Sequence, residues 1–191
     1  MDYIALGSMS GTSLDGIDCS IIRSDGISYA SEILNEFTPY SDDLKKELLK
    51  TINLKYLNNL KLIEMLNFEY QVAINKLISK FDKKIDVIGI HGQTIFHDPS
   101  SKISIQLYDK KTIYNSQAPV VCNFRKNDIL NGGEGAPILP IYHKIISDNH
   151  NLEPCIFVNI GGVTNISIIE NKKIKSGDSS FGNAIINDFL I

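Results

Sequence analysis

Residues 9–18, MSGTSLDGID, and residues 158–167, VNIGGVTNIS, are the two stretches that decide the fold of this chain. Each is a turn rich in Gly, Ser and Thr, and each lies between apolar runs that predict β-strands. A strand, such a turn and a returning strand gather several backbone N–H groups at one tip, which suits an anion. One such tip early in the chain and one late therefore predict two lobes that clamp a polyphosphate, as in a kinase or an ATPase.

The composition is that of an ordinary globular protein. Of the 191 residues, 43% are hydrophobic and 21% are charged, and the net charge of −3 gives no reason to expect nucleic acid or a membrane surface as a partner. No secretion signal is evident and no apolar run reaches the ~18 residues of a membrane span, so we expect a cytoplasmic protein. Cys19, Cys122 and Cys155 lie far apart in apolar runs, which predicts reduced, buried thiols without metal spacing.

The apolar periodicity predicts a first lobe over residues 1–150. A β-meander with Asp25-Gly26 as a hairpin turn should precede a helix capped by Ser41 and a longer helix over about residues 59–80. The strands are expected at residues 3–6, 19–22, 27–37, 86–90, 103–107 and 119–124.

Two features are expected to shape the ligand side of this lobe. The buried strand at 86–90 should end in a turn, His91-Gly92-Gln93-Thr94, where open α/β sheets place ligands. Pro137 should stand in the first turn of a helix that follows a glycine-rich loop and runs to about residue 147. The polar stretch at 147–153 is the expected boundary, and residues 154–191 then open a second lobe.

Five motifs follow one another along the chain: MSGTSLDGID, GIHGQTIFHDP, NFRKNDILNGGEGAPILP, VNIGGVTNIS and GDSSFGNAIIND. In this order they resemble the anhydro-N-acetylmuramic acid kinase family of bacterial cell-wall recycling, within the superfamily of sugar kinases, Hsp70 and actin. The resemblance implies an actin-like ATPase lobe (ribonuclease H-like), α/β in class, with a mixed sheet and flanking helices. Family members continue through a complete second lobe, so it also implies that residues 154–191 are the incomplete beginning of that lobe.

The family reaction has two parts. Water attacks the anomeric carbon of 1,6-anhydro-N-acetylmuramic acid and opens the anhydro bridge, and the freed O6 takes the γ-phosphoryl group of ATP. The expected product is N-acetylmuramic acid 6-phosphate, and the expected cofactors are ATP and Mg²⁺. Phosphoryl transfer requires mainly positioning and charge stabilisation, and ring opening requires a general base.

The resemblance also implies roles for individual residues. Asp178 would be the catalytic base, and Asp15 and Asp18 are candidates to hold Mg²⁺ through water. Arg125 suits the lactyl carboxylate or a phosphate because Arg binds such groups bidentately. The first phosphate loop would be Gly11, Thr12, Ser13, Leu14, Asp15, Gly16, Ile17 and Asp18, the second would contain Gly161 and Gly162, and the sugar would meet His91, Gln93, Thr94, Arg125 and Asn183.

The chain departs from the family pattern at four positions. Ser180 and Phe181 replace a Gly and a Pro after Asp178, and a bulky Phe in a tight turn is expected to shift the carboxylate. Glu134 and Asn123 replace Gln and Asp, and Glu134 adds negative charge beside a site for anions.

Plainer interpretations remain open beside the functional ones. The first loop is also compatible with a simple hairpin turn, Asp178 with a helix cap, His91 with a backbone hydrogen bond at a strand end, and Arg125 with a surface ion pair to Asp128. At the level of the protein, the alternatives are an inactive remnant, a sugar-binding half-enzyme, or another kind of sugar kinase. The possible protein partners are a second copy in a homodimer or a chain that supplies the missing lobe.

Overall fold

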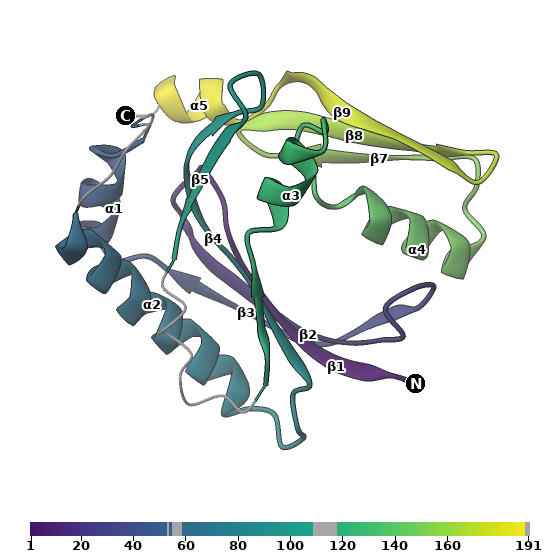
Figure 1. The fold of residues 1–191 in the computed structure, drawn as a ribbon, viewed down its shortest axis with the longest axis horizontal. Helices are drawn as coiled ribbons and strands as arrows, with labels where there is room; N and C mark the ends of the chain where they lie inside the picture. The colour runs from purple at the N-terminus through teal and green to yellow at the C-terminus, as the bar shows by residue number, and fades with distance from the viewer. Residues whose placement is uncertain (53, 55–58, 109–117, 190–191) are drawn as a thin grey trace.

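The computed structural model describes residues 1–52, 54, 59–108 and 118–189 as a mixed α/β structure with two β-sheets (Figure 1). The first sheet has the strand order β3-β2-β1-β4-β5, with β6 paired to β4, and the second has the order β7-β8-β9. The strands of the first sheet are β1 Tyr3–Ser10, β2 Gly16–Ser24, β3 Ala30–Pro39, β4 Val87–Asp98, β5 Ile103–Leu107 and β6 Val120–Cys122. The expectation of a mixed sheet with flanking helices is confirmed.

The first sheet combines an antiparallel meander with parallel strands. β1, β2 and β3 pair antiparallel, whereas β4 runs parallel to β1 and β6 runs parallel to β4. Two helices, α1 (Asp42–Leu49) and α2 (Leu60–Ile78), cover one face of this sheet (Figure 1). The buried core between them includes Leu6, Ile17, Ile21, Leu44, Leu48, Leu62, Leu66, Leu77, Ile88 and Ile90.

Local capping signals in this part behave as the sequence predicts. The Asp25 carboxylate accepts hydrogen bonds from the backbone N–H groups of Ile27, Ser28 and Tyr29, which closes the hairpin between β2 and β3. The Ser41 hydroxyl caps α1 by accepting from the Leu44 N–H at 3.3 Å. Short polar side chains that satisfy free N–H groups fix these two boundaries.

The second sheet packs one of its faces against helix α4 (Pro140–His150). Its strands are β7 Cys155–Ile160, β8 Val163–Glu170 and β9 Lys173–Phe181, and helix α5 (Ala184–Phe189) follows. The His143 ring of α4 stacks on Phe157 with 4.6 Å between the ring centroids, and its Nδ1 lies 2.9 Å from the Ser167 hydroxyl. The lobe boundary near residue 150 stays a prediction, although α4, which it assigns to the first lobe, contacts the second sheet.

The predicted turn at His91-Gly92-Gln93-Thr94 is wrong. β4 continues through these residues to Asp98, and its pairing with β1 shifts register between Ser8 and Ser10. Gly92 has φ +77°, and a Cβ there would lie 2.6 Å from the Leu107 carbonyl oxygen, so the strand bulges where only Gly fits. The bulge changes which of the following side chains point toward the helices.

Three further boundaries differ from the expectations. The region after β6 forms a short helix, α3 (Phe124–Leu130), which the sequence analysis did not predict. Pro140, rather than Pro137, occupies the first turn of α4. Asp178 lies within β9 rather than in a loop before a helix, and the β8–β9 register shift at Thr164/Asn165 makes Ser179 the extra residue of a bulge.

All three cysteines are free thiols, as expected. Cys19 is buried, whereas Cys122 and Cys155 are only half-buried, so the expectation of burial is confirmed for Cys19 alone. Burial, followed by the nearby charge of Asp18, raises the pKa of the Cys19 thiol to about 12. In the described part of the chain, no helix combines the length and the apolar character that crossing a membrane requires.

Candidate functional site

The first glycine turn, residues 11–15, joins β1 to β2 and turns its polar side chains outward. Leu14 adopts the left-handed conformation with φ 59°, which is costly for a residue with a Cβ, but its side chain is buried in the core. The Leu14 N–H donates to the Gly11 carbonyl at 3.3 Å and closes the turn. Thr12, Ser13 and Asp15 stay exposed at its tip. Leu14, which was predicted to belong to the first phosphate loop, thus anchors the turn in the core, and its side chain lies away from the exposed tip.

Gly16 and Ile17 belong to β2 and fix where the turn ends. A Cβ at Gly16 would lie 2.2 Å from the Thr38 carbonyl oxygen, so only glycine allows β3 to approach. The Ile17 side chain has no exposed surface. These two residues position the turn from within the sheet.

Asp15 and Asp18 form an exposed pair of carboxylates next to the turn. Partial burial and then the charge of Asp15 raise the pKa of Asp18, so the two groups lie within electrostatic reach of each other. Neighbouring carboxylates are oxygen donors of the kind Mg²⁺ accepts, directly or through water. The described residues contain no cluster of three or more metal-ligating side chains.

The second glycine turn, Gly161-Gly162, joins β7 to β8 and is held by the residues after β9. Gly182 N–H donates to the Gly162 carbonyl at 3.1 Å, and Asn183 N–H donates to the Gly161 carbonyl at 2.7 Å. The Asn183 side-chain amide also donates to the Ile160 carbonyl at 3.2 Å. Asn183, a predicted sugar contact, therefore supports the turn in this structure.

The two glycine turns face each other. A Cβ built on Gly162 would lie 4.0 Å from the Thr12 hydroxyl oxygen, although about 150 residues separate the two in sequence. The turns thus approach each other from two different sheets, whereas the expectation that two lobes clamp a polyphosphate stays a prediction. The absence of a side chain at Gly162 keeps the gap beside Thr12 open.

His91 and Arg125 form a second part of the site, on β4 and α3. Arg125 Nε donates to His91 Nε2 at 3.0 Å, and its Nη1 donates to the Gly135 carbonyl at 3.1 Å. Burial and then the Arg125 charge lower the pKa of His91 to about 4. The imidazole is therefore neutral near pH 7, with its proton on Nδ1, 2.7 Å from the Gly92 carbonyl.

The alternative pairing of Arg125 with Asp128 is wrong. The Asp128 carboxylate accepts from the Gly135 N–H at 2.7 Å, and among the described residues no ion pair joins it to Arg125. Arg125 is half-buried and keeps its charge at neutral pH. A guanidinium that is partly removed from water and held by neutral groups is well suited to an anionic ligand.

Asp178 is exposed on β9. Burial and the Arg125 charge lower the pKa of His97, whereas Asp178 opposes this shift, so His97 lies within electrostatic reach of both. The His97 Nδ1 is 2.9 Å from the Ser104 hydroxyl of β5. The sequence analysis assigned no role to His97, because its place near Arg125 and Asp178 depends on the tertiary structure.

Gln93 and Thr94 lie on different sides of the first sheet. Gln93 has no exposed surface, and its amide bonds to Gly11, Thr94 and Tyr40, so the structure puts it behind the first glycine turn. Thr94 accepts a long 3.5 Å hydrogen bond from Gln106 of β5 on the α3 side. Only Thr94 of this pair faces the side on which Arg125 and Asp178 lie.

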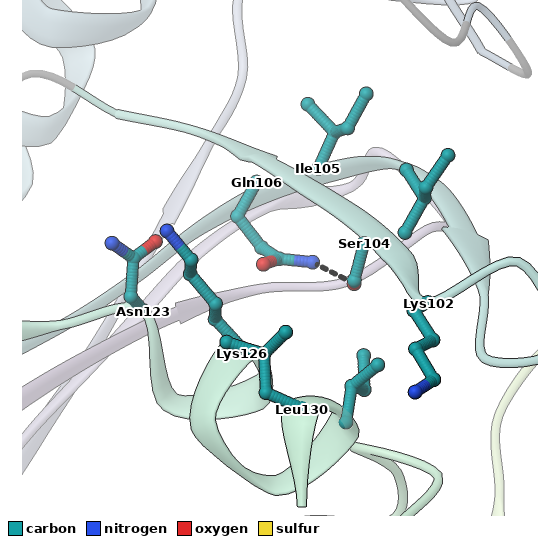
Figure 2. Close-up of a pocket in the computed structure, with 9 residues that line it drawn as sticks. Lys102, Ser104, Ile105, Gln106, Asn123, Lys126 and Leu130 are labelled. Atoms are coloured by element: carbon teal, nitrogen blue, oxygen red, sulfur yellow. Dashed lines mark hydrogen bonds between the residues drawn. The ribbon is translucent and has the colours of Figure 1, made fainter. Parts of the chain in front are cut away.

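A cavity of about 340 Å³ opens between β5 and α3 on that side (Figure 2). Its polar wall contains Ser104 and Gln106, which share a 2.6 Å hydrogen bond, and Lys102 and Lys126 lie at its two sides. Through Ser104 it adjoins His97. The remaining lining residues are Ile103, Ile105, Asn123, Ile129 and Leu130.

Comparison with known proteins gives a consistent result over the whole length of the chain. The family model for anhydro-N-acetylmuramic acid kinase matches residues 2–190. Similar curated proteins with that name include one from Pelagibacter ubique, 38% identical over 98% of this chain and 54% of its own length. Another is from Rhodopseudomonas palustris, 30% identical over 100% of this chain and 56% of its own length, and a third, from Bacillus cereus, is 34% identical over 97% and 53%. The chain spans about half the length of the curated relatives it matches.

The matched region includes both glycine turns, the His91–Arg125 pair and Asp178. The chain belongs to the anhydro-N-acetylmuramic acid kinase family.

Proposed function

We propose that this chain acts in the ATP-dependent phosphorylation of 1,6-anhydro-N-acetylmuramic acid with hydrolytic ring opening, which yields N-acetylmuramic acid 6-phosphate. The observation that carries the proposal is the approach of the two glycine turns, with Gly162 opposite Thr12. Two sets of backbone N–H groups that converge from two sheets are suited to a polyphosphate. We also propose the actin-like arrangement of lobes for this chain and a cytoplasmic location, where ATP is available.

At the nucleotide end, the exposed tip residues Thr12 and Ser13 would donate to phosphate oxygens, and Gly161 and Gly162 would approach them from the other side. Asp15 and Asp18 would hold Mg²⁺ through water. When bound, the ion would neutralise charge on the phosphate oxygens. The raised pKa of Asp18 next to Asp15 supports this assignment, because a nearby cation would relieve the repulsion between the two carboxylates.

At the sugar end, Arg125 would bind the lactyl carboxylate, and neutral His91 would keep the guanidinium in place by accepting its Nε–H. Asp178 would take a proton from the water that attacks the anomeric carbon. As the new bond from the water oxygen to that carbon forms, the bond from the carbon to O6 breaks. O6 then bonds to the γ-phosphorus of ATP while the bond from that phosphorus to the β-phosphate oxygen breaks, and ADP leaves. Arg125 and Asp178 each lie within electrostatic reach of His97, which supports a common site.

The test is transfer of labelled phosphate from ATP to 1,6-anhydro-N-acetylmuramic acid in the presence of Mg²⁺. Asp178→Asn should lower kcat by roughly a hundredfold or more, because the general base is lost. Asp148→Asn on α4, where the carboxylate pairs with Lys144 at the surface, is the matched control and should retain activity. Equal turnover in wild type and Asp178→Asn would reject the assignment of the base.

A second candidate, a sugar-binding protein without turnover, is favoured by the bulge at Ser179 in β9. A shift of the neighbouring Asp178 carboxylate would remove the base and leave the Arg125 contact with the sugar in place. Calorimetric titration with the anhydro sugar separates the two, since this candidate predicts binding that Arg125→Met abolishes, with no labelled product.

A further inference from the structure

A buried set of polar side chains lies behind the first glycine turn, and the proposed reaction does not use it. Ser10 and Gln93 have no exposed surface, and Tyr40 and Tyr70 are 4% and 3% exposed. They come from β1, β4, the segment before α1, and α2. Polar groups in a core cost stability unless they are hydrogen-bonded, so their partners reveal what they do.

Gln93 connects this set to the turn itself. Its Nε2 donates to the Gly11 carbonyl at 3.0 Å and to the Thr94 carbonyl at 3.1 Å. Its Oε1 accepts from the Tyr40 hydroxyl at 3.1 Å. Because backbone carbonyls only accept, the amide nitrogen must be the atom that faces Gly11, and Tyr40 fixes the amide in that orientation.

Ser10 and Tyr70 connect β1 to α2 and to β4 next to the Gln93–Gly11 contact. The Ser10 hydroxyl lies 2.6 Å from the Tyr70 hydroxyl and donates to the Gly92 carbonyl at 3.1 Å. Gly92 is the bulge residue that turns Gln93 toward the helices. Burial raises the pKa of both tyrosines, so both hydroxyls keep their protons.

The Gly11 carbonyl therefore points into the protein, held by Gln93 from β4 and by the Leu14 N–H from the turn. In a planar trans peptide the C=O and the N–H point in opposite directions. The N–H of Thr12, in the same peptide unit, consequently points away from the core, on the side where Thr12 faces Gly162.

We propose that Gln93 is a positioning residue that keeps the Gly11–Thr12 peptide turned so that the Thr12 N–H faces the phosphates. With this peptide reversed, the Gly11 carbonyl oxygen would face the anion and repel it. The inference rests on the proposed function for the identity of the ligand, but the peptide orientation itself is independent of it. If Gln93 served packing alone, an apolar side chain of equal size would replace it without effect on the turn.

The experiment compares Gln93→Met, of similar volume but without a donor, with wild type. Calorimetric titration with Mg-ATP should give an affinity at least about tenfold weaker, as expected for one lost hydrogen bond to a charged group. The Thr12 amide signal in nitrogen–proton NMR spectra, recorded without nucleotide, should move, because the Gly11–Thr12 peptide is no longer held in one orientation. Ser147→Ala is the matched control, because Ser147 is also fully buried but contacts Cys155 far from the turn.

The outcomes separate the two proposals. If wild type does not bind Mg-ATP, the proposed function fails, while the Thr12 signal still tests the positioning role. If Gln93→Met lowers the melting temperature as Ser147→Ala does and leaves both the affinity and the Thr12 signal unchanged, the positioning role is rejected. Should Gln93→Met not fold, Tyr40→Phe keeps the amide and removes only its anchor, and it should give a smaller change in the same two measurements.

Discussion

The two glycine turns face each other, but they are supported in different ways. The first turn is supported from the core. The buried Gln93 side chain holds the Gly11 carbonyl, and Gly16 in β2 allows β3 to approach closely. The second is held by hydrogen bonds from Gly182 and Asn183 near the surface. The packing of the first sheet therefore fixes the first turn. The second turn depends on local hydrogen bonds, which can change at a small cost in the free energy of unfolding.

The same contrast holds for the sheets that carry the turns. The first sheet packs its core against α1 and α2, whereas, among the residues that the structure describes, the second sheet is covered by α4 on one face only (Figure 1). On its other face Ile156, Val158 and Ile160 are 61%, 58% and 62% exposed. Four substitutions, taken from the largest expected effect to the smallest, test this contrast.

Gly16→Ala should have the largest effect, because the first turn is set by the core. The new Cβ would meet the Thr38 carbonyl oxygen, so β2 and β3 must separate at a cost of roughly 3 kcal/mol of unfolding free energy. Urea denaturation measures it. Gly7→Ala on β1, where a Cβ meets nothing within 4 Å, is the control and should change stability by no more than about 0.5 kcal/mol. Equal losses in both variants would contradict the close-packing argument.

The pH dependence of stability should be dominated by the first sheet. The pKa of His91 is lowered to about 4 in the folded state, so on acidification the unfolded chain takes up a proton that the folded chain does not. The unfolding free energy should therefore fall by about 2 kcal/mol between pH 7 and pH 5 and continue to fall toward pH 4.

His91→Asn should flatten this slope, which denaturation at each pH measures directly. His143, beside the second sheet, has its pKa lowered by a smaller degree of burial, so His143→Asn should leave most of the slope in place. If His143→Asn flattens the pH dependence of the unfolding free energy and His91→Asn does not, the second sheet responds more strongly to acid than the first.

Gly182→Ala should affect the second turn locally. The new Cβ would lie 2.1 Å from the Gly161 carbonyl oxygen, but the turn is only half-buried and can shift, so we expect a stability loss of only about 1 kcal/mol. Because the turn moves, the affinity for Mg-ATP should fall about tenfold. Gly177→Ala on β9, the strand that precedes Gly182, has open space around a Cβ and should leave the affinity unchanged. An intact affinity in Gly182→Ala would remove the second turn from the binding site.

The sequence predicted those features that depend on a few neighbouring residues. Asp25 and Ser41 satisfy nearby N–H groups, and both boundaries were predicted correctly. The bulge at Gly92 was not predicted, because it depends on the approach of Leu107 from β5, and the burial of Gln93 next to it was not predicted either.

The buried polar set was also missed, although one signal for it exists. Tyr70 stands in the apolar stripe of α2 between Leu66 and Ala73, and a buried Tyr hydroxyl needs a partner. The partner, Ser10, is 60 residues away in the chain, so its identity depends on how α2 packs on the sheet. Contacts of this range follow from the tertiary structure and not from local pattern.

The smallest effect is expected on the uncovered face of the second sheet. Ile156→Thr removes apolar surface that already meets water and keeps a β-branched side chain, so the unfolding free energy should change by less than about 0.5 kcal/mol. Ile21→Thr in the first sheet, where the side chain has no exposed surface, should cost several-fold more. If Ile156→Thr proves as costly as Ile21→Thr, the face is covered in solution. Repeating the denaturation over a range of protein concentrations then decides what covers it, since a cost that vanishes on dilution identifies a second copy of the chain and a constant cost identifies a contact within the same protein.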